Sequence, residues 1–510
     1  MVDIVNPAVL EGIARALSLD AVLYCTLGVT LGMFVGVLPG IGILPTIALL
    51  IPLTFYLDPM TGIAMLAGIY YGAAYGGSTA SILLNMPGTA NTAVTCLDGY
   101  PMAQQGRSGV ALFMTTIASF VGSILGIVIL AAFAFPLAAL ALRFGSQEYF
   151  ALMVLGLVAA SMMSSSTPFK SLSMVVFGLV LGIVGIDVTS GVPRFTFGII
   201  QFSDGISLVA IALGLFGLSE LFRNAGVPRA VNVTARDITL RSMLPTSDDW
   251  KRSIPAMLRG TGVGSIFGPL PGTGSTIASF ISYAVERRVS ATPGRFGKGA
   301  IEGIAGPEAA NNAAIQTAFI PTLTLGIPGD AVMALMIGVL MIHGIAPGPQ
   351  LMTNDPGMFW GLIVTFLFGN IVLLFLNIPL IGLWVRILSI PYTVLFPAVV
   401  GFLCIGVYSV SYSVMDLYVL LVLGVAGHLL IYCGFPIAPI LLGLILGPML
   451  EENFRRSLLV QRGDFMGFFH RPISGTLLVL TGLLLVAAMI VETRRVLKMR
   501  RQRDDSHPAG

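Results

Sequence analysis

Residues 27–42 read LGVTLGMFVGVLPGIG, and residues 259–274 read RGTGVGSIFGPLPGTG. The two stretches align without a gap at a constant offset of 232 (Gly28 to Gly260), and seven positions match. The matching residues are Gly28, Gly32, Gly36, Leu38, Pro39, Gly40 and Gly42, paired with Gly260, Gly264, Gly268, Leu270, Pro271, Gly272 and Gly274. Seven gapless matches are improbable by chance even in a chain with 60 glycines. The sequence therefore predicts two homologous halves.

A second pair of motifs follows the two copies. Residues 85–91 read NMPGTAN and residues 326–331 read GIPGDA. A Pro-Gly pair inside an apolar segment removes a backbone donor and permits a left-handed residue, so a helix should end there. In hydrocarbon the freed backbone groups persist only where protein or a water-filled cavity satisfies them. The four breaks, at 39–42, 85–91, 271–276 and 328–330, are expected to converge on one interior site.

The composition predicts an all-α protein that crosses a membrane many times. Of the 510 residues, 56% are hydrophobic and 10% are charged, whereas soluble proteins carry about 25% charged residues. Apolar stretches long enough to span a bilayer recur at 110–135, 149–163, 172–186, 197–221, 358–383, 391–410, 417–432 and 473–491. With two further apolar regions that Pro and Gly interrupt, 21–105 and 254–350, we expect about ten to twelve membrane-crossing elements.

Charge divides the chain into four segments. We expect a first repeat at 1–222, a basic linker at 223–259, a second repeat at 260–492 and a basic tail at 493–510. Both basic segments should be cytoplasmic, because cytoplasmic loops of membrane proteins carry excess Lys and Arg. The N-terminus has one Arg against three acidic residues before residue 21. This asymmetry favours opposite topology for the two halves, the inverted-repeat plan of secondary transporters.

Several function classes have no support in the sequence. The net charge of +3 is too small to indicate a nucleic-acid partner. The four cysteines show no metal-ligand spacing, and no P-loop or H-E-x-x-H motif occurs. We therefore expect neither a cofactor nor a metal. The N-terminal residues also lack the basic start of a cleaved targeting segment.

Each predicted break exposes helix ends that can bind ions. N-terminal helix ends suit an anion, and unwound carbonyls suit a small cation. The candidate substrate-binding residues are Pro39, Gly40, Gly42, Asn85, Pro87, Gly88, Thr89, Asn91, Gly272, Thr273, Gly274, Ser275, Thr276, Pro328 and Gly329. The candidate ion-coupling residues are Ser78, Thr79, Asn311, Asn312 and Asp330.

Two intramembrane acids stand out near the breaks. Asp330 directly follows Pro328-Gly329 and is the strongest candidate for cation coupling, because charges within membrane segments are costly and mark function. Glu308 has two readings that the sequence leaves open: a coupling role, or an electrostatic preference for a helix N-terminus. The glycine series at 28, 32 and 36 and at 260, 264 and 268 has the small-xxx-small spacing of helix packing.

Three motifs resemble the large membrane subunit of tripartite tricarboxylate transporters, the TctA family. They are GVLPGIG at 36–42, YYGAAYGGSTASILLNMPGT at 70–89 and PEAANNA at 307–313. The resemblance implies a multi-pass carrier of the bacterial inner membrane, with re-entrant hairpins, broken helices and an elevator-like mechanism. It implies two protein partners, a small four-span membrane subunit and a periplasmic solute-binding protein. It also implies uptake of citrate or another organic carboxylate by symport with Na⁺ or H⁺.

Two other function classes remain open from the sequence. An intramembrane enzyme acting on a lipid or carboxylate would need a nucleophile, a base or a metal cluster at the breaks, where only Asp330 and Glu308 offer acid chemistry. A channel is the other alternative, which saturable, gradient-coupled uptake would exclude. The sequence also leaves open whether the working unit is a single chain or a homodimer.

Overall fold

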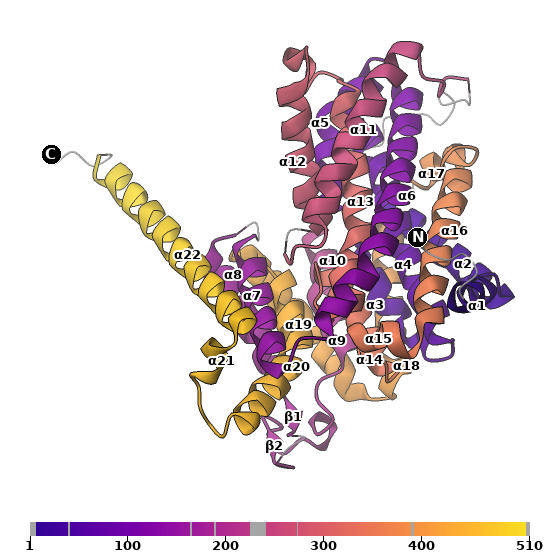
Figure 1. Cartoon of the computed structure of the whole chain (residues 1–510). Coiled ribbons are helices and arrows are strands. Elements are labelled where there is room, and N and C mark those ends of the chain that lie inside the picture. Colours follow the sequence, from indigo (N-terminus) through magenta and orange to yellow (C-terminus); the bar gives the residue numbers. More distant parts are fainter. Residues whose placement is uncertain are drawn as a thin grey trace. The chain divides into compact units, whose positions relative to one another are not determined.

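The computed structural model describes residues 7–38, 41–163, 166–187, 190–224, 241–272, 274–388 and 392–505. Its regular structure is almost entirely helical (Figure 1). The sheet found in these residues has two short antiparallel strands, β1 (Gly185–Ile186) and β2 (Pro193–Arg194), with Gly185 opposite Arg194. The predicted all-α class is confirmed apart from this hairpin.

The chain forms two compact units. The first comprises Met1–Leu142 and Ser207–Leu429, and the second comprises Arg143–Ile206 and Leu430–Gly510. These units and the predicted repeats divide the chain along different lines, because residues 143–206 of the first predicted repeat belong to the second unit. The predicted boundaries of the repeats, the linker and the tail stay predictions. Residues 225–240 of the linker and 506–510 of the tail lie outside the described residues.

The first unit contains the four predicted breaks and most of the helices. Its elements are α1 (Pro7–Ala16), α2 (Leu19–Val37), α3 (Ile43–Thr54), α4 (Pro59–Leu84), the 3₁₀-helix η1 (Ala90–Thr95), α5 (Cys96–Gln104), α6 (Ser108–Ala141), α9 (Leu208–Ala212), the π-helical η3 (Leu213–Leu218), α10 (Ser219–Asn224), α11 (Ser247–Phe267), α12 (Gly274–Val289), η5 (Pro293–Arg295), α13 (Glu302–Leu325), α14 (Ala331–Ile342), α15 (Pro349–Asn354), α16 (Pro356–Asn377), α17 (Ile381–Ile387) and α18 (Tyr392–Ser411). Helix α19 (Val414–Tyr432) begins in this unit.

The second unit is built around a helix bundle and the β-hairpin. It contains α7 (Ser146–Met162), α8 (Pro168–Gly182), η2 (Ile200–Phe202), α20 (Ala438–Val460), α21 (Gly467–His470) and α22 (Pro472–Asp505). Arg194 of β2 pairs with Glu451 of α20 at 2.7 Å. Arg455, one turn further along α20, pairs with Asp187 at 3.0 Å. These ion pairs hold both sides of the hairpin to α20.

Two of the apolar stretches are not single helices. The stretch at 197–221 was expected to span, but residues 197–207 form a loop with η2, and α9, η3 and α10 follow from Leu208. Gly198 and Gly205 take positive φ there, at 77° and 88°, which is incompatible with a continuing right-handed helix. Likewise α8 ends at Gly182, and β1 occupies the end of the stretch at 172–186. Hydropathy alone does not reveal such turns.

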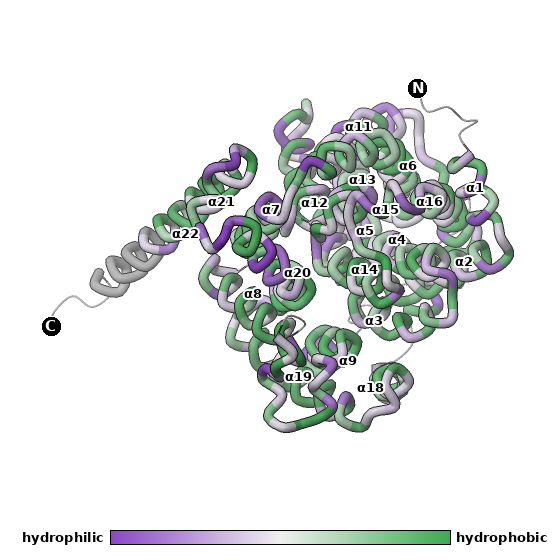
Figure 2. The backbone as a smooth tube through the Cα atoms, turned by 60° about the horizontal axis from the view of Figure 1, so that its bottom comes forward, coloured by the Kyte–Doolittle hydropathy of each residue, from purple (hydrophilic) through white to green (hydrophobic). Residues whose placement is uncertain are grey.

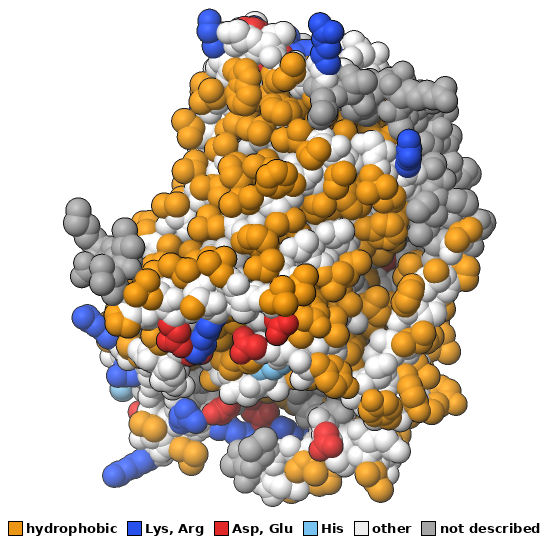
Figure 3. Space-filling model, turned by 90° about the vertical axis from the view of Figure 1, so that its right-hand side faces the viewer, with side chains coloured by type: hydrophobic (Ala, Val, Ile, Leu, Met, Phe, Trp, Pro, Cys, Tyr) orange, Lys and Arg blue, Asp and Glu red, His pale blue; other side chains and the backbone are white. Residues whose placement is uncertain are grey.

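Five of the described helices are long and apolar enough to cross a membrane. They are Leu19–Val37, Ser108–Ala141, Pro356–Asn377, Val414–Tyr432 and Pro472–Ile490. Shorter apolar helices accompany them, and hydrophobic residues dominate most helices in Figure 2. Hydrophobic side chains also cover much of the face drawn in Figure 3, with Lys and Arg at its upper edge and Lys, Arg, Asp and Glu in its lower part. The chain is therefore a multi-pass membrane protein, while the count of ten to twelve crossings stays a prediction.

The repeated glycines bring two pairs of helices into backbone contact. A Cβ added to Gly28, Gly32 or Gly36 of α2 would lie 2.1–2.3 Å from carbonyl oxygens of α4, those of Met65, Ile69 and Ala73 respectively. A Cβ on Gly260, Gly264 or Gly268 would lie 2.1–2.4 Å from carbonyl oxygens of α13, those of Gly306, Ala310 and Ala314. The contacted residues of α13 lie 241 positions after those of α4 (306 − 65). The two pairs therefore pack in the same register, as expected for two copies of one motif.

Candidate functional site

Helices end at the first and third predicted breaks. Helix α2 ends at Val37 and α3 begins at Ile43, with Gly42 at φ 84°. Pro39 and Gly40 of this break lie outside the described residues. Helix α11 ends at Phe267 and α12 begins at Gly274, with Gly272 at φ 79° and Gly274 at φ 53°. Thr273 between them also lies outside the described residues.

The second and fourth breaks have matching geometry. Helix α4 ends at Leu84 and is followed by Asn85 in the left-handed region, at φ 54°. Helix α13 ends at Leu325 and is followed by Gly326, also left-handed, at φ 68°. Asn85 and Gly326 are 241 positions apart (326 − 85), the offset that relates the helix contacts above. Each long helix thus ends in the same left-handed cap before its Pro-Gly pair.

The chain leaves these two breaks through equivalent caps that differ in charge. Thr89 is the N-cap of η1 and forms a capping box with Thr92. Asp330 is the N-cap of α14, and its Oδ1 accepts a hydrogen bond from the N–H of Met333 at 2.9 Å. Both pairs keep the offset of 241 (330 − 89 and 333 − 92). The two halves therefore present a neutral cap and an acidic cap at corresponding positions.

The breaks lie against one another within each half. The N–H of Gly272 donates to the carbonyl of Gly329 at 2.8 Å, which joins the third break to the fourth. A Cβ on Gly88 would lie 2.0 Å from the carbonyl oxygen of Gly36, so the second break packs against the end of α2. In the other half, a Cβ on Gly329 would lie 3.0 Å from the carbonyl oxygen of Gly268.

Two side-chain contacts connect each half with the break of the other. Tyr70 of α4 donates its hydroxyl to Oδ2 of Asp330 at 2.7 Å. Asn91 of η1 donates to Oδ1 of Asn311 in α13 at 2.7 Å. Tyr70 and Asn311 are again 241 positions apart (311 − 70). Each long helix therefore reaches the break that follows the long helix of the other half.

A buried carboxylate lies beside the second break. Glu308 of α13 is 1% exposed, and its Oε1 accepts hydrogen bonds from Ser78 of α4 at 2.7 Å and Thr95 of η1 at 2.5 Å. Its Oε2 accepts one from Ser119 of α6 at 3.3 Å. Glu308 lies inside α13 and therefore not at the N-terminus of its own helix. It contacts the N-terminal end of another helix, because its partner Thr95 directly precedes the first residue of α5. The structure thus places the carboxylate at a junction of four elements.

The predicted site residues divide into two groups around these acids. Gly272, Gly274, Gly329 and Asp330 come together at the third and fourth breaks. Ser78, Asn91 and Asn311 gather near Glu308, and Asn312 donates to the backbone carbonyl of Glu308 at 3.0 Å. The remaining predicted residues vary in exposure. Thr79, Gly88, Thr89, Ser275 and Pro328 are buried, Gly42 and Thr276 are partly buried, and Asn85 and Pro87 are exposed.

The sequence does not single out three residues that complete these groups, Tyr70, Thr95 and Ser119, and it leaves the role of Glu308 open between ion coupling and a helix N-terminus. An available signal was the position of Glu308 in an otherwise uncharged intramembrane run, PEAANNA. For the three hydroxyl residues no local pattern distinguishes them from packing residues.

Several buried polar atoms near these groups form no hydrogen bond of standard geometry in the described structure. They are Tyr71 Oη, Ser123 Oγ, Asn311 Nδ2, Asn312 Oδ1 and both terminal atoms of Gln316. Three of these residues, Asn311, Asn312 and Gln316, lie on α13, three to eight residues after Glu308. Buried polar groups without partners are few in folded proteins, and each calls for an explanation such as bound water or an ion. Among the described residues no group of three or more His, Cys, Asp or Glu side chains could hold a metal ion.

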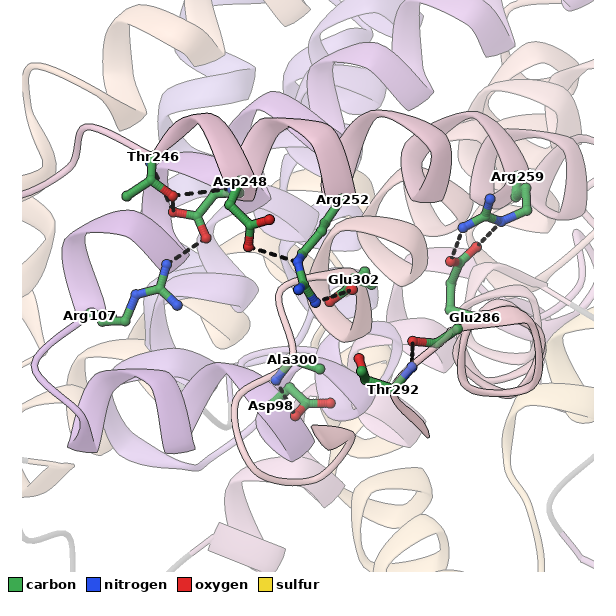
Figure 4. Close-up of polar contacts among 12 residues, drawn as sticks. Asp98, Arg107, Thr246, Asp248, Arg252, Arg259, Glu286, Thr292, Ala300 and Glu302 are labelled. Carbon is green, nitrogen blue, oxygen red and sulfur yellow. Dashed lines mark hydrogen bonds and ion pairs between the residues drawn. The ribbon is translucent and has the colours of Figure 1, made fainter. Parts of the chain in front are cut away.

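A set of ion pairs holds together the helices that carry the breaks (Figure 4). Arg259 of α11 binds Glu286 of α12 through two hydrogen bonds, of 2.9 and 2.5 Å. Arg107, just before α6, pairs with Asp249 of α11 at 2.6 Å. Burial raises the pKa of Asp249, but hydrogen bonds from Arg107 and Thr246 outweigh burial, so that its pKa is lowered overall.

A further carboxylate fixes the loop that precedes α13. Asp98 of α5 is fully buried, and its Oδ1 accepts hydrogen bonds from the N–H groups of Gly297, Gly299 and Ala300 at 2.8–2.9 Å. Its Oδ2 accepts one from the hydroxyl of Tyr283 at 2.9 Å. Since α5 follows the second break, Asp98 links that break to the start of α13.

Comparison with known proteins gives the following matches. The model of the family described as "Tripartite tricarboxylate transporter TctA family" matches residues 22–442. An uncharacterised 52.8 kDa protein in the TAR-I ttuC' 3' region of Agrobacterium vitis is 47% identical over 502 residues, which cover 97% of this chain and 98% of the relative. An uncharacterised protein in the TAR-II ttuC' 3' region of the same organism is 51% identical over 231 residues, 45% of this chain and 96% of the relative. No solved structure matches the chain.

Proposed function

Because the chain belongs to the tripartite tricarboxylate transporter TctA family, and is thus the membrane subunit of such a transporter, we propose that it imports citrate or a related organic carboxylate by Na⁺ symport. The resemblance drawn from the three sequence motifs is confirmed by the family match. Membership in a family of transporters favours transport over the intramembrane-enzyme alternative.

The observation that supports the site is the junction of the third and fourth breaks. There the Gly272–Gly329 hydrogen bond lies next to Asp330, which Tyr70 of the other half contacts. The N-terminal end of α14 offers N–H groups to an anion, and unwound carbonyls nearby suit a cation. In this proposal the N–H groups and the neutral polar side chains at the breaks hold the carboxylates of the substrate. No basic cluster is then needed within the membrane.

The coupling ion binds beside the substrate. Ion coupling uses the carboxylate of Asp330 at the third and fourth breaks and, on α4 and α13, the neutral oxygens of Ser78, Thr79, Asn311 and Asn312. Na⁺ is the proposed ion and H⁺ is the alternative. All four breaks lie in the first compact unit. In this proposal that unit carries the substrate across the membrane in an elevator-like movement. The two halves of the chain have opposite topology, as in the inverted repeats of secondary transporters.

The proposed assembly includes two further proteins. A periplasmic solute-binding protein delivers the carboxylate, and a small four-span membrane subunit completes the carrier in the bacterial inner membrane. The basic tail faces the cytoplasm in this arrangement, consistent with the positive-inside bias. In this assembly the present chain can also form a homodimer.

Uptake into membrane vesicles that contain this chain and its two partners tests the proposal. Labelled citrate and other carboxylates are supplied with and without an inward Na⁺ gradient, and we expect saturable uptake only with the gradient. Replacing Pro39, Gly40, Pro271 and Gly272 together with alanine should abolish it, whereas Gly262→Ala, where an added Cβ meets open space, should not. Unchanged uptake in the fourfold variant would contradict the assignment of the substrate site to the breaks. Uptake that proceeds equally without any ion gradient would contradict symport.

A further inference from the structure

Glu308 is an acid buried at the meeting point of four segments, and it has no basic partner in the described part of the chain. The carboxylate is 1% exposed, and the side chains that donate to it, Ser78, Thr95 and Ser119, are 3%, 0% and 1% exposed. All three donors are neutral hydroxyls. None of the ion pairs in the described part of the chain involves Glu308. An isolated ionised carboxylate is costly to bury, so the site needs a positive charge from solution.

The groups around Glu308 have the chemistry of a Na⁺ site. Two carboxylate oxygens and three hydroxyl oxygens converge, and a hydroxyl that donates its proton keeps lone pairs for a cation. The carboxamide oxygen of Asn312, one turn along α13, is buried and has no hydrogen-bond partner among the residues that the structure describes. Hard cations prefer such oxygen ligands. One negative charge and several neutral oxygens match a monovalent ion.

The site is connected to the second break through η1. Thr95, which donates to Glu308, is the last residue of η1, and Asn91 near the start of η1 donates to Asn311, three residues after Glu308 in the sequence. Occupancy at Glu308 therefore acts on the segment that leaves the second break. Such a connection couples the binding of an ion to the geometry of a substrate site, and the coupling is reciprocal.

We infer that Glu308, with the hydroxyls of Ser78, Thr95 and Ser119, binds a Na⁺ ion that is separate from the ion at Asp330. The role of this site in coupling rests on the proposed symport, whereas the binding of Na⁺ at Glu308 does not depend on that proposal. Glu308 is then a ligand of the driving ion, and the three hydroxyls add ligands from α4, η1 and α6 to the coordination shell of that ion.

Thermal unfolding of the purified full-length chain tests this assignment directly. Na⁺ is titrated against choline at constant ionic strength, because an ion that binds only the folded protein raises the melting temperature. Glu308→Gln keeps the shape of the side chain and an oxygen acceptor but removes the charge. We expect its half-saturating Na⁺ concentration to rise at least tenfold. Ser119→Ala, which removes a single oxygen, should show a smaller increase.

The matched control is Glu302→Gln, the same change on the same helix, at a carboxylate that pairs with Arg252. It should keep the wild-type half-saturating concentration. If Glu308 has only a structural role, Glu308→Gln lowers the melting temperature without changing its Na⁺ dependence, and the inference is overturned. It is also overturned if the wild type responds to acidification but not to Na⁺. Asp330→Asn measured in parallel should leave a residual Na⁺ response, and adding Glu308→Gln to that variant should remove it.

Uptake measurements separate this inference from the proposed function. If wild type and Glu302→Gln show Na⁺-driven carboxylate uptake and Glu308→Gln shows the same uptake at the same Na⁺ concentrations, only the Glu308 site fails. If the wild type transports no carboxylate, the proposed function fails while the Na⁺ titration still decides the binding site.

Discussion

The hydroxyl of Tyr70 donates to Oδ2 of Asp330 at 2.7 Å, across 260 residues of sequence. The other carboxylate oxygen of Asp330 accepts the N–H of Met333 and so caps α14. One side chain thus fixes the start of α14 and holds it to α4. The contact joins two halves that the sequence shows only as a repeat.

Tyr70→Phe should weaken transport without preventing folding. A hydrogen bond to a charged group contributes about 1.5–3 kcal/mol, which corresponds to roughly a tenfold to hundredfold change in affinity. We expect the half-saturating concentrations of ion and substrate to rise by about this factor in vesicle uptake. Tyr75→Phe is the matched control, because Tyr75 lies on the same helix and donates to a neutral acceptor, Asn370, at 3.2 Å. An equal effect of both variants would contradict a special role for the Asp330 contact.

Gly264→Ala should destabilise the first unit, whereas Gly262→Ala should not. A Cβ on Gly264 would lie 2.1 Å from the carbonyl oxygen of Ala310, so α11 and α13 would have to separate. Overpacking of this kind costs about 1–3 kcal/mol. Gly262, on the same helix, has no neighbour within 4 Å of an added Cβ, and alanine there should add about 0.5–1 kcal/mol of helix stability. Thermal unfolding in detergent measures both, and a loss of stability in Gly262→Ala would argue against the packing.

Arg259→Gln should lower the free energy of unfolding, because it leaves the buried carboxylate of Glu286 without its charged partner. Glu286 is 1% exposed, and its two hydrogen bonds come from Arg259, whose side chain is 38% exposed. Breaking a fully buried pair costs about 3–5 kcal/mol, and the partial exposure of Arg259 reduces our expectation to about 2 kcal/mol. The double variant Arg259→Gln/Glu286→Gln should be more stable than Arg259→Gln alone. Arg456→Gln, which breaks an exposed pair with Glu452, should change the free energy of unfolding by less than about 0.5 kcal/mol.

Arg107→Gln should change the pH dependence of stability. The pKa of Asp249 is lowered from 3.8 in the folded state, so its ion pair stabilises the protein above that value and is lost as pH falls through the folded pKa. At pH 7 the variant should be less stable by up to about 1 kcal/mol. Below about pH 4 the difference from the wild type should shrink, because protonated Asp249 no longer pairs with arginine. A difference that does not vary with pH would show that Arg107 acts through packing alone.

Asp98→Ala should release the loop before α13. Three backbone N–H groups of that loop lose their acceptor when the carboxylate is removed. The loop contains Lys298, an exposed trypsin site, so we expect faster tryptic cleavage there. Asp98→Asn keeps an oxygen for the three donors and should be cleaved at an intermediate rate. Cleavage of Asp98→Ala at the wild-type rate would mean that other contacts hold the loop.

The sequence predicts the local features of this fold well. Pro-Gly pairs end helices through backbone geometry, and helices end at all four of the positions where the motifs place breaks. The glycine series predicts close helix contact, but not which helix is contacted, because α4 and α13 are partners through tertiary packing. The stretch at 197–221 fails as a single span because apolar composition hides the glycine turns within it.

No pattern in the sequence predicts the tertiary contacts of the site. Asn311 and Asp330 were predicted from their positions beside breaks, whereas the role of Glu308 depends on three hydroxyls from α4, η1 and α6. Tyr70 lies within a motif that resembles the family, yet its partner is a property of the folded chain. Such contacts lie 189 to 260 residues apart in the sequence, where no periodic pattern relates the two members.

The cross-contacts between the halves also have a consequence for biosynthesis. Asn91 lies 220 residues before Asn311, and Tyr70 lies 260 residues before Asp330. At ribosomal rates of about 5–20 residues per second, the first half waits on the order of tens of seconds for these partners. During that interval its hydroxyl and carboxamide need water, lipid headgroups or the insertion machinery as temporary partners. The order of synthesis therefore makes the first half the more vulnerable one to misassembly in the membrane.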